Sequence, residues 1–247
     1  MKILAIDTSS KNCSVAIVEA NKNNYNNYEI ITFKNSDDEK THSQKLMPMI
    51  DEAFKESKLC LDKIDLLACC LGPGSFTGIR IGIATIKAFA DAKNIPTVGS
   101  TSLESLAYNI EENGIICPII DCKNENVYSS LFSNTNGSYS QIENNVADNI
   151  NSCIDIFINN LQSSSSKVNR ITFVGNGSVL YKDLILQKVK EANLSLKVDF
   201  SNKNTQSSIS LAKSAYDKYQ KGLYGDSNYI SPVYLRKSQA ERAKFGD

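Results

Sequence analysis

The sequence is poor in the side chains that build most metal and hydrolytic sites. Only one of its 247 residues is a histidine, His42. A single imidazole excludes a two-histidine metal site, and no partner spacing supports a Ser-His-Asp triad. His42 stands between Thr41 and Ser43 near the start of an expected helix, where we expect a surface or capping role. We therefore predict no metal ligands and no catalytic residues.

Long apolar runs, paired cysteine motifs and net charge are missing as well. No segment approaches about 18 consecutive apolar residues, and the first apolar run is too short for a secretory signal. We expect no membrane span and a cytoplasmic protein. The seven cysteines include no C-x-x-C pair, so neither a disulfide framework nor a zinc ribbon is expected.

The charge balance argues against a surface that binds nucleic acid strongly by itself. Lys+Arg and Asp+Glu both count 27, whereas affinity for a phosphate backbone comes from an excess of cations. We expect the isolated chain to bind nucleic acid weakly at most. One basic cluster stands out near the end of the sequence: Arg236, Lys237, Arg242 and Lys244.

Strand and helix patterns alternate along the chain, which predicts an α/β fold. An apolar run ending in a carboxylate, residues 3–7, opens a predicted hairpin with residues 13–19. Residues 117–121 repeat this arrangement, and a strand at 126–132 follows them. Strands, a helix and a strand ending in a glycine turn come next in both halves, so we interpret the chain as an internal repeat. Helices are predicted near residues 41–58, 76–93, 102–112, 147–161, 180–192 and 209–221.

The most specific string, residues 72–82, is a glycine turn leading into a helix. A helix N-terminus favours an anion, because its free N–H groups and dipole point outward. No Gly-Lys-[Ser/Thr] closes the string, so it is not a Walker A loop. One interpretation is a nucleotide or phosphate site made by Asp7, Thr8, Ser9, Gly72, Gly74 and Ser75. The other is a pair of structural turns, since no glycine stands between residues 7 and 12.

Glycines at every fourth position form a stripe along the helix predicted at 76–93. Such a stripe lets another backbone approach closely. The helix is apolar nearly all round and must be covered on nearly all sides. We therefore expect a second chain against it, although burial within one chain competes with this idea. The expected interface residues are Leu46, Ile50, Gly74, Phe76, Gly78 and Gly82. If the stripe faces outward, leucine at Gly78 or Gly82 weakens pairing and leaves the lobe folded.

Several strings, in chain order, resemble the TsaB (YeaZ) family. They are ILAIDTS at 3–9, HSQKLMP at 42–48, the glycine string at 72–82, IDC at 120–122 with VY at 127–128, and PVYLR at 232–236. The resemblance runs nearly end to end and is weakest over 133–203. It implies an ASKHA (actin-like, ribonuclease H-like) fold with two duplicated lobes. We expect the N-terminal lobe to comprise residues 1–105 with 206–247, and the C-terminal lobe residues 106–205.

The resemblance also implies a function. It implies a noncatalytic subunit that binds and activates its paralogue TsaD when a threonylcarbamoyl group is formed on adenosine 37 of tRNAs reading codons that begin with adenine. The implied partners are a TsaD homologue in a heterodimer, the TsaE ATPase in the assembly, a second copy in a homodimer, and tRNA only through the complex. The chain itself is expected to need no cofactor, and ATP or ADP at a complex interface stays open.

The paralogue's metal motif has no counterpart here. Its His-x-x-x-His pair aligns with Ser102 and Leu106, so a transition-metal site of that kind cannot form. The alternative function is a free-standing ATP-dependent ASKHA kinase or acyltransferase that uses Asp7 or Asp121. A metal-dependent glycoprotease is disfavoured by the single histidine.

Overall fold

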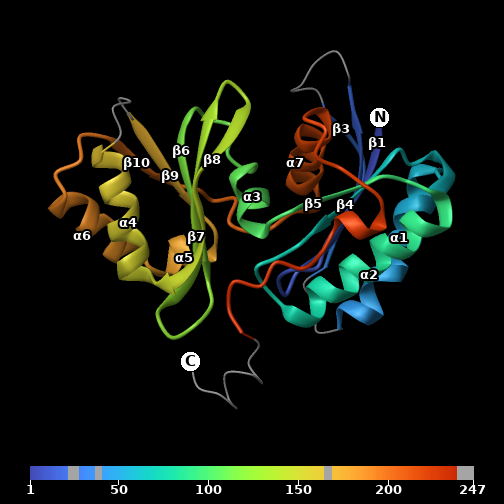
Figure 1. Cartoon of the computed structure of the whole chain (residues 1–247), viewed down its shortest axis with the longest axis horizontal. Coiled ribbons are helices and arrows are strands. Elements are labelled where there is room, and N and C mark those ends of the chain that lie inside the picture. The colour runs from blue at the N-terminus through green and yellow to red at the C-terminus, as the bar shows by residue number, and fades with distance from the viewer. Residues whose placement is uncertain (22–27, 37–40, 164–168, 238–247) are drawn as a thin grey trace. The chain divides into compact units, whose positions relative to one another are not determined.

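The computed structural model describes residues 1–21, 28–36, 41–163 and 169–237. The chain divides into two compact units, Met1–Ser105 with Gln206–Asp247 and Leu106–Thr205 (Figure 1). Two members of the predicted basic cluster, Arg242 and Lys244, lie outside the described residues. Within those described ranges, no helix is long and apolar enough to cross a membrane.

A five-stranded sheet with the order β3-β2-β1-β4-β5 forms the centre of the first unit. Its strands are β1 (Lys2–Asp7), β2 (Cys13–Ala20), β3 (Tyr28–Ser36), β4 (Leu66–Cys70) and β5 (Thr97–Ser100). The central strand β1 pairs antiparallel with β2, where Asp7 lies opposite Ser14, and parallel with β4, where Ile6 lies opposite Cys69. Asp7 therefore ends the middle strand of the sheet.

Helices cover both faces of this sheet, which explains why β1 is a continuous apolar run. Leu4 and Ile6 point into a core shared with α1 (His42–Ser57) and α2 (Phe76–Lys93). Ile3 and Ala5 point into a second core shared with α7 (Ser208–Gln220). In Figure 1, α7 lies on one side of the sheet, and α1 and α2 lie on the other. Two short 3₁₀ helices, η1 (Leu61–Lys63) and η2 (Ser227–Tyr229), complete the unit.

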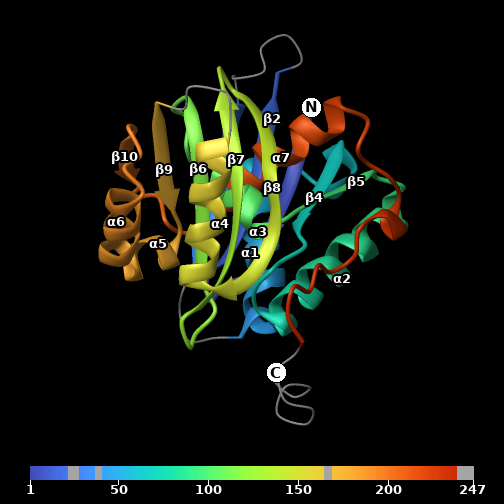
Figure 2. The same ribbon diagram turned by 60° about the vertical axis from the view of Figure 1, so that its left-hand side comes forward.

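The second unit is built on a sheet with the order β10-β9-β6-β7-β8. Its strands are β6 (Gly114–Asp121), β7 (Asn126–Thr135), β8 (Ser138–Asn149), β9 (Arg170–Val174) and β10 (Lys197–Phe200). The helices of this half of the sequence are α3 (Ser102–Ala107), α4 (Ile150–Ser163), α5 (Asn176–Leu180) and α6 (Lys182–Glu191). One apolar core joins α4 and α6 to the sheet. Figure 2 shows α4 lying along the face of this sheet.

The two sheets repeat one topology. β6 pairs antiparallel with β7 and parallel with β9, as β1 pairs with β2 and β4. An edge strand beside the hairpin and a second parallel strand complete each sheet. This confirms the expected α/β fold of the ASKHA type with a duplicated arrangement.

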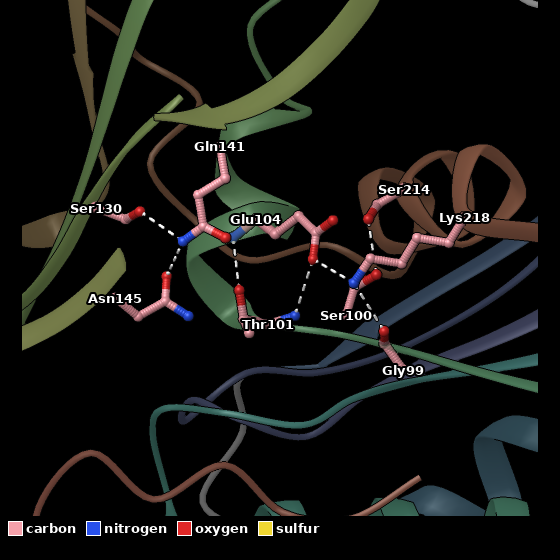
Figure 3. A network of polar contacts seen from close by, with 9 residues as sticks. All are labelled: Gly99, Ser100, Thr101, Glu104, Ser130, Gln141, Asn145, Ser214 and Lys218. Carbon is pink, nitrogen blue, oxygen red and sulfur yellow. Dashed lines mark hydrogen bonds and ion pairs between the residues drawn. The ribbon is translucent and has the colours of Figure 1, made fainter. Parts of the chain in front are cut away.

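Three predicted elements differ from the observed ones. The edge strand β8 was missed, and the helix that follows it begins at Ile150 rather than at 147. β8 is mostly polar and exposed, so it lacks the pattern that signals a strand; pairing with β7 and the side chain of Gln141 hold it instead. Gln141 donates to the Ser130 hydroxyl at 3.1 Å and to the Asn145 amide oxygen at 3.0 Å (Figure 3). The helix predicted at 102–112 ends at Ala107. The helix predicted at 180–192 is α6, which begins at Lys182, and a short helix that was not predicted, α5, precedes it.

Candidate functional site

The carboxyl group at the end of β1 is closed to solvent. Asp7 is only 1% exposed. Its Oδ1 accepts hydrogen bonds from the Ser9 amide at 2.9 Å and from the Ser9 hydroxyl at 2.7 Å. Its Oδ2 has no hydrogen-bond partner among the described residues. Burial raises the pKa of Asp7, and the bonds from Ser9 offset part of that rise. Asp7 therefore holds its own turn and has little access to an outside ligand.

The glycine turn before α2 packs directly on the turn that follows Asp7. A Cβ at Gly74, whose φ is +156°, would overlap the carbonyl oxygen of Ser9. The Ser75 amide donates to the same oxygen at 2.7 Å. The Ser75 hydroxyl caps α2 by accepting from the Gly78 amide at 3.2 Å. Two amides that would attract an anion are thus already bonded within the chain. The six-residue phosphate site stays a prediction, and this packing favours the structural interpretation of both turns.

The glycine stripe of α2 faces its own unit, so the expectation that it faces outward is wrong. A Cβ at Gly78 would overlap the carbonyl oxygen of Thr8 and approach the His42 ring to 2.6 Å. One at Gly82 would lie 2.5 Å from the Thr8 hydroxyl oxygen. That hydroxyl donates to the Gly78 carbonyl at 2.7 Å. The close backbone approach that the spacing indicated is real, but the neighbour is the β1–β2 turn.

The other residues predicted at a partner interface are also largely committed to their own unit. Leu46 and Ile50 on α1 are 1% and 2% exposed and belong to the core under α1 and α2. Their expected place on an outer surface is therefore wrong. Phe76 is partly buried and stacks on Tyr234, with ring centroids 4.6 Å apart and planes 8° apart. Phe76 keeps part of its surface in solvent.

His42, the only histidine, connects the β1–β2 turn to α2. The ring nitrogen Nε2 of His42 lies 2.7 Å from the carbonyl oxygen of Ser10, a geometry in which Nε2 donates. The ring also lies against Gly78. The expected surface or capping role is wrong, because Thr41 occupies the N-cap of α1 and its amide donates to Gln44 at 3.1 Å. Sequence reasoning missed this role, since the contact partners lie far from His42 along the chain.

The outward face of α2 carries short side chains along its middle, with Arg80 and Asp91 exposed toward its ends and Lys87 half-buried between them. Thr77, Arg80, Ala84 and Ala88 are exposed, whereas Ile79, Ile83 and Ile86 are buried on the opposite side. Residues 80, 84 and 88 recur at helical spacing and lie in one line. Only Arg80 carries a charge in this line. The sequence predicted that this helix is apolar nearly all round and needs to be covered. It did not show which side of the helix faces outward.

The two positions aligned with the paralogue's histidines have structural roles. The Ser102 hydroxyl donates to the Pro73 carbonyl at 2.6 Å, and the Ser102 amide donates to the Gly72 carbonyl at 2.9 Å. Both bonds fix the glycine turn. Leu106 is fully buried. Neither side chain offers a nitrogen ligand to a transition metal.

A polar network beside Ser102 ties the start of α3 to α7 (Figure 3). The Lys218 ammonium contacts the Glu104 carboxylate at 2.6 Å and donates to the Gly99 carbonyl at 3.0 Å. The Ser100 and Ser214 hydroxyls form a hydrogen bond with each other, with their oxygens 2.7 Å apart. These bonds hold the segment that leaves β5 against the α7 face of the first sheet.

The second unit has its own version of the carboxylate turn. Asp121 ends β6, and its Oδ1 accepts from the Lys123 amide at 3.2 Å and from the Tyr181 hydroxyl at 3.1 Å. Burial and the nearby Asp121 charge raise the pKa of Tyr181. A Cβ at Gly175 would overlap the Ile119 carbonyl oxygen, as one at Gly74 would overlap Ser9. Both units therefore pack a glycine turn against the end of their central strand.

A duplicated topology, with a carboxylate at the end of each central strand and a glycine turn packed beside it, defines an actin-like (ASKHA) protein. The family model described as TsaD, tRNA N6-adenosine threonylcarbamoyltransferase, matches residues 35–244. The chain is 30% identical over 188 residues, 75% of each chain, to the tRNA threonylcarbamoyladenosine biosynthesis protein TsaB of Bacillus subtilis. The chain belongs to the TsaB family within this group.

Two further comparisons extend over almost the whole chain. A TsaB protein of Buchnera aphidicola is 27% identical over 240 residues, 95% of this chain and 98% of that one. The structure of YeaZ from Pseudomonas aeruginosa superimposes with a TM-score of 0.71 at 21% identity, covering 95% and 99% of the two chains. The fold therefore extends over the segment where the sequence resemblance is weakest.

Proposed function

We propose that this chain acts in threonylcarbamoyladenosine formation on tRNA as a noncatalytic subunit that binds and activates a TsaD homologue. Membership of the TsaB family supports the pathway. The subunit role rests on the outward face of α2. In the assembly, TsaE supplies the ATPase, and tRNA is bound through the complex rather than by this chain alone.

The face of α2 suits the close packing of a second helix. Ala84 and Ala88 are exposed one turn apart, with Ile81 and Thr85 partly exposed beside them. Helix axes pack about 8–10 Å apart, and small side chains permit the short end of that range. Along the middle of α2 the exposed residues are alanines, and a helix face of this kind is uncommon unless another chain covers it. The pairing surface therefore lies opposite the glycine stripe.

The lack of metal-binding side chains at the positions aligned with the paralogue's metal ligands supports a noncatalytic role. The positions aligned with the paralogue's metal ligands hold a serine bonded to Pro73 and a buried leucine. His42 is engaged with the Ser10 carbonyl. A subunit of this kind contributes a surface, while the metal chemistry resides in its partner.

The alternative of a free-standing kinase or acyltransferase is less well supported. Such an enzyme needs a carboxylate that reaches solvent and a turn with free amides. Asp7 is buried with a raised pKa, and the Ser9 carbonyl accepts the Ser75 amide. A nucleotide at this turn would have to displace the chain's own contacts. We therefore assign any ATP or ADP to the assembly and not to this turn.

Co-elution with the TsaD homologue from the same organism tests the proposal. Ala84→Glu places a charge in the middle of the outward face and should abolish the complex, while circular dichroism stays unchanged. Leu186→Glu is the matched control, because Leu186 is an exposed apolar residue on α6 of the second unit. Threonylcarbamoyl transfer to tRNA should fall with Ala84→Glu and persist with Leu186→Glu. A wild-type chain that forms no complex, or an Ala84→Glu chain that pairs normally, would refute the proposed role of this face.

A further inference from the structure

The chain after η2 forms a strap along the start of α2. We use "C-terminal strap" for residues 230–234. Ile230 anchors it, since this side chain is fully buried in the core under α1 and α2. The Val233 amide donates to the Leu71 carbonyl at 2.8 Å. A Cβ at Gly72 would lie 2.9 Å from the Val233 carbonyl oxygen, so the strap is pressed onto the glycine turn. Tyr234 is thereby held beside the first turns of α2.

Tyr234 fixes the orientation of Arg80. Its ring stacks on Phe76, and its hydroxyl oxygen accepts a hydrogen bond from Arg80 Nε at 2.8 Å. The Arg80 guanidinium carbon also lies 5.6 Å from the Tyr234 ring centroid. Tyr234 itself remains 40% exposed. An exposed arginine normally samples many rotamers, whereas this one is held by a stacked aromatic ring.

We propose that Arg80, oriented by Tyr234, binds a carboxylate of the partner at one end of the pairing face of α2. This inference rests on the proposed function, because it names the chemistry that the partner presents there. The Tyr234 bond uses Nε, which leaves the two terminal NH₂ groups of the guanidinium to make further hydrogen bonds. No carboxylate in the described part of the chain lies within ion-pair distance of Arg80. The partner residue is therefore an Asp or Glu on a helix that packs along Ala84 and Ala88.

The spacing of the exposed residues on α2 brings a packed partner helix to Arg80. Arg80, Ala84 and Ala88 are exposed at four-residue spacing, so a helix packed on the two alanines meets Arg80 one turn further on. Covering an arginine without a counter-charge is costly, and a carboxylate bound by the guanidinium relieves that cost. A tRNA phosphate is the other anion that an arginine binds. It is disfavoured here, because the face of α2 that continues from Arg80 carries one half-buried lysine, Lys87, and the exposed carboxylate of Asp91, whereas phosphate backbones are bound by several cations together.

Titration of the TsaD homologue at low and high salt tests the inference. Arg80→Gln keeps most of the side chain and removes the charge, and it should raise the Kd of the complex roughly tenfold at low salt. Its Kd should also vary less with salt than that of the wild type. Arg80→Lys should recover only part of the affinity, since an ammonium cannot pair as a planar fork. Tyr234→Phe keeps the stacked ring but removes the acceptor for Nε, so it should raise the Kd about threefold by loosening Arg80.

Matched controls separate this inference from the proposed function. Tyr224→Phe removes the hydroxyl of a tyrosine that is 43% exposed away from α2, and it should leave the Kd unchanged. If Arg80→Gln pairs like the wild type at both salts while Ala84→Glu does not pair, the carboxylate contact is refuted and the proposed function stands. If both variants pair normally, both ideas fall. If Arg80→Gln weakens tRNA binding and leaves pairing intact, Arg80 serves the nucleic acid and the inference is overturned.

Discussion

Replacing Gly78 by alanine should reverse the usual effect of removing a glycine from a helix. Alanine in a helix interior is favoured over glycine by about 1 kcal/mol. At Gly78, however, the new Cβ overlaps the Thr8 carbonyl oxygen and lies 2.6 Å from the His42 ring. The oxygen belongs to the backbone of a buried turn and cannot move like the end of a flexible side chain.

The expected size of the effect follows from three contributions. Overpacking of this kind costs about 1–3 kcal/mol. Separating α2 from the turn also strains or breaks the bond from the Thr8 hydroxyl to the Gly78 carbonyl, 2.7 Å long in the native protein, at about 1 kcal/mol. After subtracting the helix gain of about 1 kcal/mol, Gly78→Ala should lower the free energy of unfolding by about 1–3 kcal/mol. Gly78→Leu, with a longer side chain in the same space, should prevent the first unit from folding.

Urea unfolding followed by far-UV circular dichroism measures this change. With a slope of about 2 kcal/mol per M, a loss of about 2 kcal/mol lowers the urea midpoint by roughly 1 M. Ala84→Gly is the control on the same helix, because Ala84 is exposed and the change should cost only the helix preference, about 1 kcal/mol. A Gly78→Ala protein more stable than the wild type by about 1 kcal/mol would show that the stripe faces open space, and our packing argument would be wrong.

Three further predictions concern Asp7, the ion pair of Glu104 with Lys218, and the metal content of the chain. Burial raises the pKa of Asp7, so its contribution to stability is complete below the unfolded value of about 4 and is lost as pH rises through the folded value. Asp7→Asn should therefore gain stability relative to the wild type in thermal melts as the pH rises above about 4, and parallel pH profiles would contradict this. Glu104→Gln leaves the Lys218 ammonium, 2.6 Å away in a partly buried site, without its counter-charge. It should lower the free energy of unfolding by about 1–2 kcal/mol, as measured with urea. The control Asp51→Asn, which breaks the exposed pair of Asp51 with Lys55, should lower it by less than about 0.5 kcal/mol. Elemental analysis should find no stoichiometric zinc or iron in the purified chain, and about one such metal per chain would overturn the noncatalytic assignment.

Much of the fold could be predicted because local patterns report it directly. The apolar runs at 3–6 and 117–120 each stop at an aspartate, and both are central strands of their sheets. β8 could not be found in this way. It is a polar edge strand stabilised by pairing with β7 and by the hydrogen bond from its own Gln141 to Ser130 of β7. Its residue pattern does not show either contact. Comparison of the two halves would have indicated it, because β3 occupies the same place in the first sheet.

The sequence by itself indicated close packing at Gly74, Gly78 and Gly82, because glycine leaves room that a side chain would fill. It also determined that no pair of imidazoles exists to bind a metal. Only the tertiary structure decided that the approaching backbone is the β1–β2 turn and that Tyr234 lies against Arg80, which is distant from it along the chain. A residue pattern indicates how closely a neighbour can pack, because the size of each side chain is given by the sequence itself. Which neighbour comes close depends on contacts between residues far apart in sequence, and those exist only once the sheet and its helices have packed.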